Sequence, residues 1–167
     1  RRLSSAASDV YKRQVTEGGN TGQRLSTSNA SNHGNIGSDA VDLSVQSLAS
    51  STRGATGFKA VAMGSNTTAS GSISTAIGNA NEASGTFSTS MGVSTLASGY
   101  GSTSMGNYTV ASGWHSTAMG SNSTASGSYS TAIGLYATAS DYSSTVIGHH
   151  NSSGSSVTNN ATSFSTS

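Results

Sequence analysis

The stretch GSNSTASGSYSTAIG, from Gly120 to Gly134, contains the repeat that decides the fold. A main series of glycines recurs every fourteen residues, at Gly64, Gly78, Gly92, Gly106, Gly120, Gly134 and Gly148. A secondary series lies midway, at Gly57, Gly71, Gly85, Gly99, Gly113 and Gly127, and is continued by Asp141. A period kept this strictly is typical of a solenoid of stacked repeats rather than of a conventional globular core.

Each unit has the composition of two short strands joined by tight bends. Ser, Thr, Ala and Ile fill the segments between the glycines, and glycine reaches positive φ without steric cost. We therefore predict an all-β parallel solenoid with fourteen residues per coil and about seven coils over residues 51–150. Like positions of successive coils should stack directly above each other.

Three columns of residues recur with the glycines. Five residues after each main-series glycine stands an alanine: Ala69, Ala83, Ala97, Ala111, Ala125 and Ala139. Directly before it stands a large apolar residue: Met63, Ile77, Met91, Met105, Met119, Ile133 and Ile147. Three residues before it stands a β-branched one: Val61, Thr75, Thr89, Thr103, Thr117, Thr131 and Thr145.

The parity of these columns predicts the core, because alternate side chains of a strand share a face. We place the Met/Ile column inside, against the alanine column of the facing strand. The opposite orientation, with Met and Ile outward at a subunit contact, also satisfies the alternation. A coil with one large buried side chain is poor in core, so we expect neighbouring chains to contribute and the protein to self-associate.

The repeat resembles a known family. The segments STAIG (Ser74–Gly78), STAMG (Ser116–Gly120) and STAIG (Ser130–Gly134), with the Ala-Ser-Gly that follows each or a variant of it, are similar to the YadA-like head repeats of trimeric autotransporter adhesins. The resemblance covers about residues 51–150. It implies a left-handed parallel β-roll that forms a homotrimer on the bacterial surface and acts in virulence. It also implies an outer-membrane anchor in regions outside this segment.

One motif of that family is altered here. The family's hexapeptide Asn-Ser-Val-Ala-Ile-Gly is associated with collagen binding. In the corresponding hexapeptides the asparagine is absent and Thr replaces valine; they span residues 73–78, 87–92, 101–106, 115–120, 129–134 and 143–148. The resemblance therefore favours general adhesion, to an extracellular protein or a glycan, over collagen binding.

Aromatic residues recur beside the secondary bends. Tyr100, Trp114, Tyr129 and Tyr142 lie one or two residues after that bend on different coils, so they should line a ridge. Aromatic side chains supply rigid contact area, and we take these four as a candidate adhesive ridge. Alternatively, they cover the bends or pack between subunits.

The remaining polar residues do not form a site of known chemistry. His33, His115, His149 and His150 lack the accompanying Cys, Asp or Glu of a metal site, so we expect neither a metal nor a cofactor. Glu82 and Asp141 are the only carboxylates in the repeats and lie about four coils apart, so we expect no enzymatic activity. No Lys or Arg follows Ala60, which excludes a nucleic-acid surface on the repeats.

The ends of the chain differ from the repeats. Residues 1–14 resemble a translated adapter read-through, and we predict a non-native, disordered tail. Residues 15–50 read as an irregular low-complexity leader with a capping strand at 40–45, and residues 151–167 as a Ser/Thr/Asn-rich segment off the period. No run of ~20 apolar residues is present, so this segment should not insert into a membrane. The sequence looks like an internal piece of a surface protein.

Three functions fit the repeat. The first is an adhesive head module that attaches to host matrix, glycans or other cells. The second is a rigid spacer of a surface or phage-type fibre. The third is ice binding, because the Thr column would form a regular array of hydroxyls and methyls if it faced solvent.

Overall fold

The long strand of each coil begins at the β-branched column and ends one residue beyond the main-series glycine. The computed structural model describes residues 12–25 and 27–153. The parallel long strands of the roll are β3 Val41–Val45, β5 Val61–Ser65, β7 Thr75–Asn79, β9 Thr89–Val93, β11 Thr103–Asn107, β13 Thr117–Ser121, β15 Thr131–Leu135 and β17 Thr145–His149. Short strands alternate with them along the chain: β4 Gly54–Ala55, β6 Thr68–Ala69, β8 Glu82–Ala83, β10 Leu96–Ala97, β12 Val110–Ala111, β14 Thr124–Ala125, β16 Thr138–Ala139 and β18 Ser152–Ser153.

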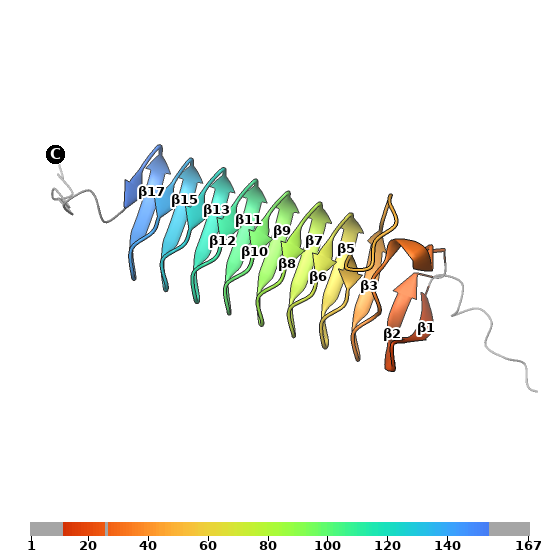
Figure 1. Cartoon of the computed structure of the whole chain (residues 1–167). Helices are drawn as coiled ribbons and strands as arrows, with labels where there is room; N and C mark the ends of the chain where they lie inside the picture. Colours follow the sequence, from red (N-terminus) through yellow and green to blue (C-terminus); the bar gives the residue numbers. More distant parts are fainter. Residues whose placement is uncertain (1–11, 26, 154–167) are drawn as a thin grey trace, which may run out of the picture.

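The two sets of strands form two sheets that run side by side along an elongated roll (Figure 1). Within the coils the strands of each sheet pair in parallel and in register: Ala69 pairs with Ala83, and Ala83 pairs with Ala97. The predicted solenoid is confirmed, with like positions stacked in single file. It is longer than the predicted seven coils because the parallel ladder already begins where β2 pairs with β3, ahead of β5.

Between the two sheets the coils bury mainly small side chains. The alanines of the short strands are fully buried, as predicted. They face a buried column on the long strands, made of Ala62, Ala76, Ser90, Ser104, Ala118, Ala132 and Val146.

The predicted inward orientation of the Met/Ile column is therefore wrong, and the alternative orientation is the observed one. Met63 is 38% exposed and Ile147 62% exposed. The other members, Ile77, Met91, Met105, Met119 and Ile133, are partly exposed on the same outer face. An inward Met or Ile would need the ordinary separation of about 10 Å between packed sheets. The bends also direct side chains inward, and the coil is so narrow that Asn81 and Thr67 are among the largest side chains it buries completely.

The two glycine series serve different needs. Main-series Gly92 has φ 129°, which side chains rarely adopt, and a Cβ there would overlap the carbonyl oxygen of Gly106 on the next coil. Secondary-series Gly99 has no positive φ, but a Cβ there would overlap the carbonyl oxygen of Gly113. At the secondary bend glycine thus allows backbone to lie directly on backbone. Positive φ occurs two residues later, as at Tyr129 with φ 59°.

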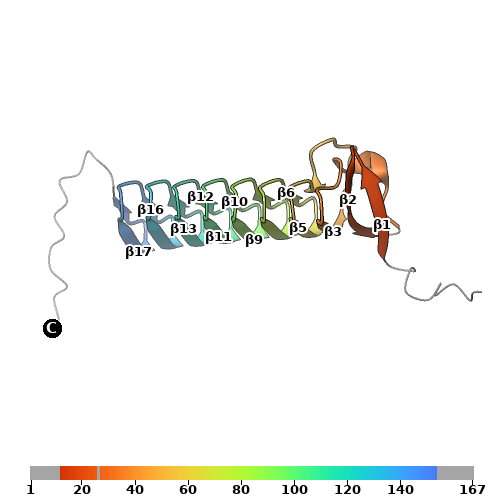
Figure 2. The same ribbon diagram turned by 90° about the horizontal axis from the view of Figure 1, so that it is seen from below.

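The N-terminal region is more ordered than the sequence predicts. The hairpin of β1 Lys12–Glu17 and β2 Asn20–Leu25 joins the end of the long-strand sheet (Figure 2). The 3-10 helix η1 Ala30–Asn32 follows it. The strand predicted at 40–45 is present as β3, but it does not cap the sheet, because β2 pairs with its outer edge. The prediction of an irregular leader is wrong for these elements, and the prediction of a disordered tail is wrong for residues 12–14, which belong to β1. Residues 1–11 of that predicted tail lie outside the described part of the chain.

At the other end, β18 continues the short-strand sheet beyond the predicted boundary at residue 150, because Ser152 pairs with Thr138 and Ser153 with Ala139. The predicted segment 151–167 otherwise lies outside the described residues. In the part of the chain that the structure describes, no helix is long and apolar enough to cross a bilayer.

Substituting Gly99 by Ala should destabilise the roll, because the added methyl overlaps the backbone of the next coil. We expect a loss of about 3 kcal/mol in the free energy of unfolding, the upper range for overpacking, measured by thermal or denaturant unfolding. The exposed neighbouring residue provides the control: Ser98→Ala should leave stability unchanged. Equal stability of Gly99→Ala and wild type would contradict the close stacking of coils.

Candidate functional site

The secondary bends carry one exposed aromatic residue on each of five successive coils. The aromatic stands at one of two adjacent positions, and the set is Phe87, Tyr100, Trp114, Tyr129 and Tyr142. All five are 42–74% exposed. Together with His115 they form the surface called here the aromatic ridge. The four residues chosen from the sequence are therefore brought into one line, although their adhesive role stays a prediction.

The rings of the ridge are in continuous contact along the roll. Ring centroids are 5.4 Å apart for Phe87 and Tyr100, 5.8 Å for Tyr100 and Trp114, 5.2 Å for Trp114 and Tyr129, and 5.6 Å for Tyr129 and Tyr142. These separations lie within the ~4.5–7 Å range in which aromatic pairs attract each other. Each ring is thus held by its neighbours before any ligand arrives, which lowers the entropic cost of binding.

His115 belongs to the ridge, and sequence reasoning missed it. Its ring centroid lies 4.5 Å from that of Trp114, 5.4 Å from that of Tyr100 and 5.6 Å from that of Tyr129. Gly101 makes room for it, because a Cβ on Gly101 would lie 2.6 Å from the imidazole Nδ1. One feature of the sequence could have indicated this contact. Gly101 and His115 are fourteen residues apart, so they occupy equivalent positions on neighbouring coils, each directly after a ridge aromatic.

Other aromatic and histidine residues lie outside the ridge. At the main bends Tyr136 contacts His150, with ring centroids 4.8 Å apart, and His149 contacts His150 at 4.1 Å. His33 is buried at the N-terminal end of the roll. Among residues 12–25 and 27–153, no group of three or more His, Cys, Asp or Glu side chains could hold a metal ion.

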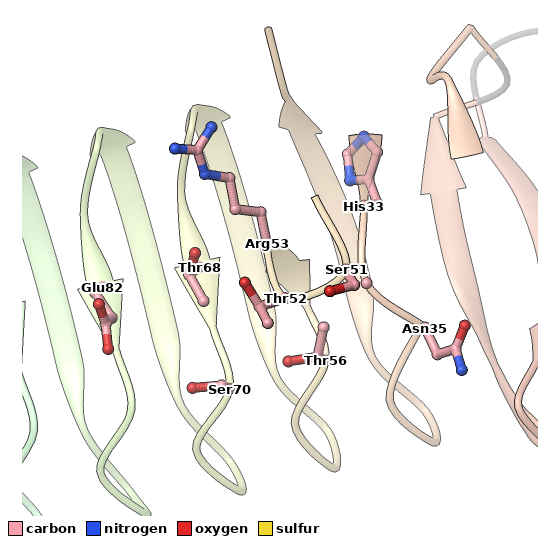
Figure 3. Close-up of a pocket in the computed structure, with 10 residues that line it drawn as sticks. His33, Asn35, Ser51, Thr52, Arg53, Thr56, Thr68, Ser70 and Glu82 are labelled. Carbon is pink, nitrogen blue, oxygen red and sulfur yellow. The ribbon is translucent and has the colours of Figure 1, made fainter. Parts of the chain in front are cut away.

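A polar groove lies on the outer face of the short-strand sheet, near its N-terminal end (Figure 3). Its volume is about 660 Å³. Its lining residues come from the segment before β3, the loop before β4, and the first short strands: His33, Gly34, Asn35, Ser51, Thr52, Arg53, Thr56, Thr68, Ser70 and Glu82. No large apolar side chain lines it. Nothing in the repeat pattern points to this groove, and in the sequence Glu82 stands out only as an isolated carboxylate.

An insertion in the first coil builds one wall of the groove. Val41 pairs with Val61, whereas each later strand pairs with the residue fourteen positions on, as Thr75 does with Thr89. The extra residues lie in the loop 46–53 between β3 and β4. They were hidden from the repeat analysis because they lack the glycine period.

The loop is fixed to the roll by hydrogen bonds. Ser47 donates from its backbone N–H and its hydroxyl to Asn66 Oδ1, at 3.1 and 2.9 Å. Arg53 Nη1 donates to the same oxygen at 3.2 Å, and the Arg53 carbonyl accepts from Gly34 N–H at 2.8 Å. The Ser50 backbone N–H donates to the Ser31 carbonyl at 3.2 Å. The guanidinium of Arg53 is therefore held at the groove by its own side-chain and backbone contacts.

The groove carries one charge of each sign. Arg53 comes from the loop before β4, and Glu82, on β8, lies at the end of the lining away from Asn35 (Figure 3). Neither belongs to an ion pair within the described residues, where the ion pairs involve only Arg24, Glu17, His33 and Asp42. A smaller hollow lined by Leu48 and Asn66 shares both Arg53 and Glu82 with the groove.

Behind the groove, a buried polar network closes the N-terminal end of the roll. Arg24 Nη1 donates to both Glu17 carboxylate oxygens at 2.7 and 3.0 Å, and its Nε donates to Asp42 Oδ2 at 3.3 Å. His33 Nδ1 lies 2.9 Å from the same Asp42 oxygen, and the Ser44 hydroxyl donates to Oδ1 at 2.5 Å. Both side chains of the Arg24–Asp42 pair are fully buried.

The charge state of Asp42 follows from these contacts. Burial raises the pKa of its carboxyl, but the hydrogen bonds from His33 and Ser44 and the nearby His33 charge outweigh it, so its pKa lies below the ordinary 3.8. A depressed carboxyl pKa stabilises the fold above the unfolded-state pKa. That contribution is lost as the pH falls below about 3.8.

The repeats match a known protein family. The family described as YadA head domain repeat (2 copies) matches residues 55–81, 73–95, 83–109, 97–123, 111–137 and 125–151. These overlapping matches cover residues 55–151, more than half of the chain. No curated protein and no solved structure matches the chain.

Substituting Asp42 by Asn should weaken the N-terminal end of the roll, because Arg24 and His33 lose a buried carboxylate. We expect a loss of about 3 kcal/mol at neutral pH, the lower range for breaking a buried ion pair, since Glu17 still binds Arg24. The measurement is unfolding as a function of pH, in which the variant should also lose the part of the acid sensitivity that arises below pH 3.8.

The exposed Asp39 supplies the matched control, since Asp39→Asn removes the same charge without a buried partner. Wild-type stability of Asp42→Asn at neutral pH would show that the network does not hold this end together.

Proposed function

Because the chain belongs to the family of YadA head domain repeats, we propose that it is the head module of a trimeric, outer-membrane-anchored adhesin on a bacterial surface. It would attach to extracellular protein or glycan by binding alone, without catalysis. The proposal rests above all on the aromatic ridge, a line of exposed rings in mutual contact over five coils.

The chemistry around the ridge supports binding to a largely uncharged surface. After Ala60 the only charged residues are Glu82 and Asp141, so the ridge has no cluster of Lys or Arg for an anionic polymer. Exposed aromatic rings contribute contact area without the large loss of rotamer freedom that flexible side chains suffer. Repetition along one chain, and again in each subunit, converts weak contacts into firm attachment.

The outward Met/Ile column supports self-association. These residues and the neighbouring Thr column lie in register along the outer face of the long-strand sheet, as Met105 pairs with Met119 and Thr103 with Thr117. A continuous apolar stripe of this kind marks an interaction surface. The narrow interior buries almost no large apolar side chain, so burying this stripe between subunits supplies stabilisation that the coil itself lacks. A homotrimer, as implied by the family resemblance, satisfies this requirement with closed symmetry.

Two alternatives rest on specific observations. The unbroken ladder of coils also suits a rigid spacer, for which the ridge would have no binding role. The outward Thr column is the observation behind the ice-binding hypothesis, but on the same face its neighbour is Met or Ile, so a flat array of two Thr columns is missing. A thermal-hysteresis assay distinguishes that case.

A charge placed in the Met/Ile column should prevent association. Met105→Lys adds a cation to the middle of the apolar stripe, and we expect sedimentation to show monomers where the wild type forms trimers. Val110→Lys is the control, because Val110 is partly exposed on the short-strand sheet instead. A monomeric wild type, or a trimeric Met105→Lys variant, would rule out this interface.

Removing the ridge should reduce attachment without unfolding the roll. In the quadruple variant Tyr100→Ala, Trp114→Ala, Tyr129→Ala and Tyr142→Ala, we expect binding to cultured epithelial cells and matrix-coated surfaces to fall at least about tenfold, since buried aromatics dominate interface energies. The readouts are bound protein, melting temperature and sedimentation.

The control removes exposed tyrosines from the other bends, by Tyr108→Ala and Tyr136→Ala, and should bind like wild type. Undiminished attachment of the quadruple variant would favour the spacer. A change in its oligomeric state would instead place the ridge between subunits.

A further inference from the structure

The polar groove beside loop 46–53 has no role in the proposed adhesion through the ridge. We propose that it is a binding site for a neutral saccharide. The aromatic ridge lies at the secondary bends, whereas this groove lies on the face of the short-strand sheet. It also lies on the sheet opposite the Met/Ile column, so association through that column would leave it open. The inference therefore stands or falls separately from the proposed function.

The lining favours a ligand that is recognised by hydrogen bonds. Five residues around the groove carry hydroxyls, namely Ser51, Thr52, Thr56, Thr68 and Ser70, and Asn35 adds an amide. Ordinary small-molecule sites are lined mainly by apolar and aromatic side chains. A protein partner would likewise need an apolar or aromatic anchor pocket, which this groove does not provide. A saccharide presents many hydroxyls and needs no such pocket.

The charged side chains of Arg53 and Glu82 further limit the chemical class of the ligand. The Arg53 guanidinium can only donate hydrogen bonds, and a carboxylate such as that of Glu82 accepts them. A ligand that engages both must offer acceptors and donors side by side. A sugar hydroxyl is both at once, whereas a carboxylate or phosphate cannot donate and would be repelled by Glu82. A neutral saccharide therefore satisfies both residues.

The groove is organised before any ligand binds. Asn66 Oδ1 receives three hydrogen bonds that fix Ser47 and Arg53, and the Thr52 and Arg53 backbone N–H groups both donate to Ser50 Oγ at 3.2 Å. Glu82 stands on a paired strand, next to Thr68 of β6. Binding residues held by rigid elements and by supporting hydrogen bonds lose little entropy on ligand binding.

The test is titration of the full chain with neutral disaccharides, namely lactose, maltose and N,N′-diacetylchitobiose, with 3′-sialyllactose as the acidic probe. The readout is NMR shifts of the backbone amides of Thr52 and Ser70 and of the Arg53 side-chain N–H. We expect at least one neutral probe to shift these signals at millimolar concentration. Glu82→Gln and, independently, Arg53→Gln should each weaken its binding about tenfold, the usual effect of losing one charged hydrogen bond.

Asp141→Asn is the matched control, because it removes the only other carboxylate of the repeats. It should bind like wild type, and so should the quadruple ridge variant, whatever that variant does to cell attachment. Absence of shifts with every neutral probe would overturn the proposal. So would unchanged affinity in Glu82→Gln, or preferred binding of the acidic probe that strengthens in Glu82→Gln.

Discussion

The contact between successive coils at their glycine bends is the constraint on which the rest of the structure depends. At both bends a Cβ would overlap the backbone of the next coil, as at Gly92 and Gly99. The bends hold the two sheets so close that the interior accepts Ala, Ser and Thr and little else. The chain therefore cannot bury its Met and Ile residues within the coil, and they form an apolar stripe outside it. This exposed stripe is the basis of the proposal that subunits associate through it.

The larger side chains of the repeats consequently lie on the outer surfaces. Three kinds of surface result from one repeat: an apolar stripe on the long-strand sheet, the aromatic ridge along the secondary bends, and the polar groove on the short-strand sheet. Because the coils stack in register, a side chain at a given position recurs at the same place on each coil. Aromatic residues at the secondary bends therefore line up as the aromatic ridge. The groove arises differently, because it needs the one place where the period is broken by loop 46–53. Its polar lining also borders the buried network of Arg24 and Asp42 that closes the roll.

The sequence predicts the roll well but does not predict which face of the long strands points inward, and both results have physical reasons. Glycine spacing fixes the coil length and the stacking of Ala69 on Ala83, because backbone can approach backbone only there. The alternation of side chains along the long strands is compatible with either face pointing inward. Whether Met105 points inward depends on the separation of the sheets, which cannot be read from the repeat pattern. The ridge was visible in Tyr100 and Trp114 because they recur at bends. The contact of His115 with the ridge was not predicted, because it depends on the space left by Gly101. The groove was not predicted, because its loop 46–53 does not follow the fourteen-residue repeat.

The most direct test of the narrow interior is the environment of the methionine methyl groups. In protein labelled at the methyls of Met and Ala, nuclear Overhauser effects report which of these groups are in contact. We predict none between the Met105 methyl and the interior alanines Ala97 and Ala111, and contacts instead with methionine methyls of stacked coils or of neighbouring subunits. Strong effects between Met105 and Ala111 would place the methionines inside the coil and contradict the narrow, alanine-filled interior.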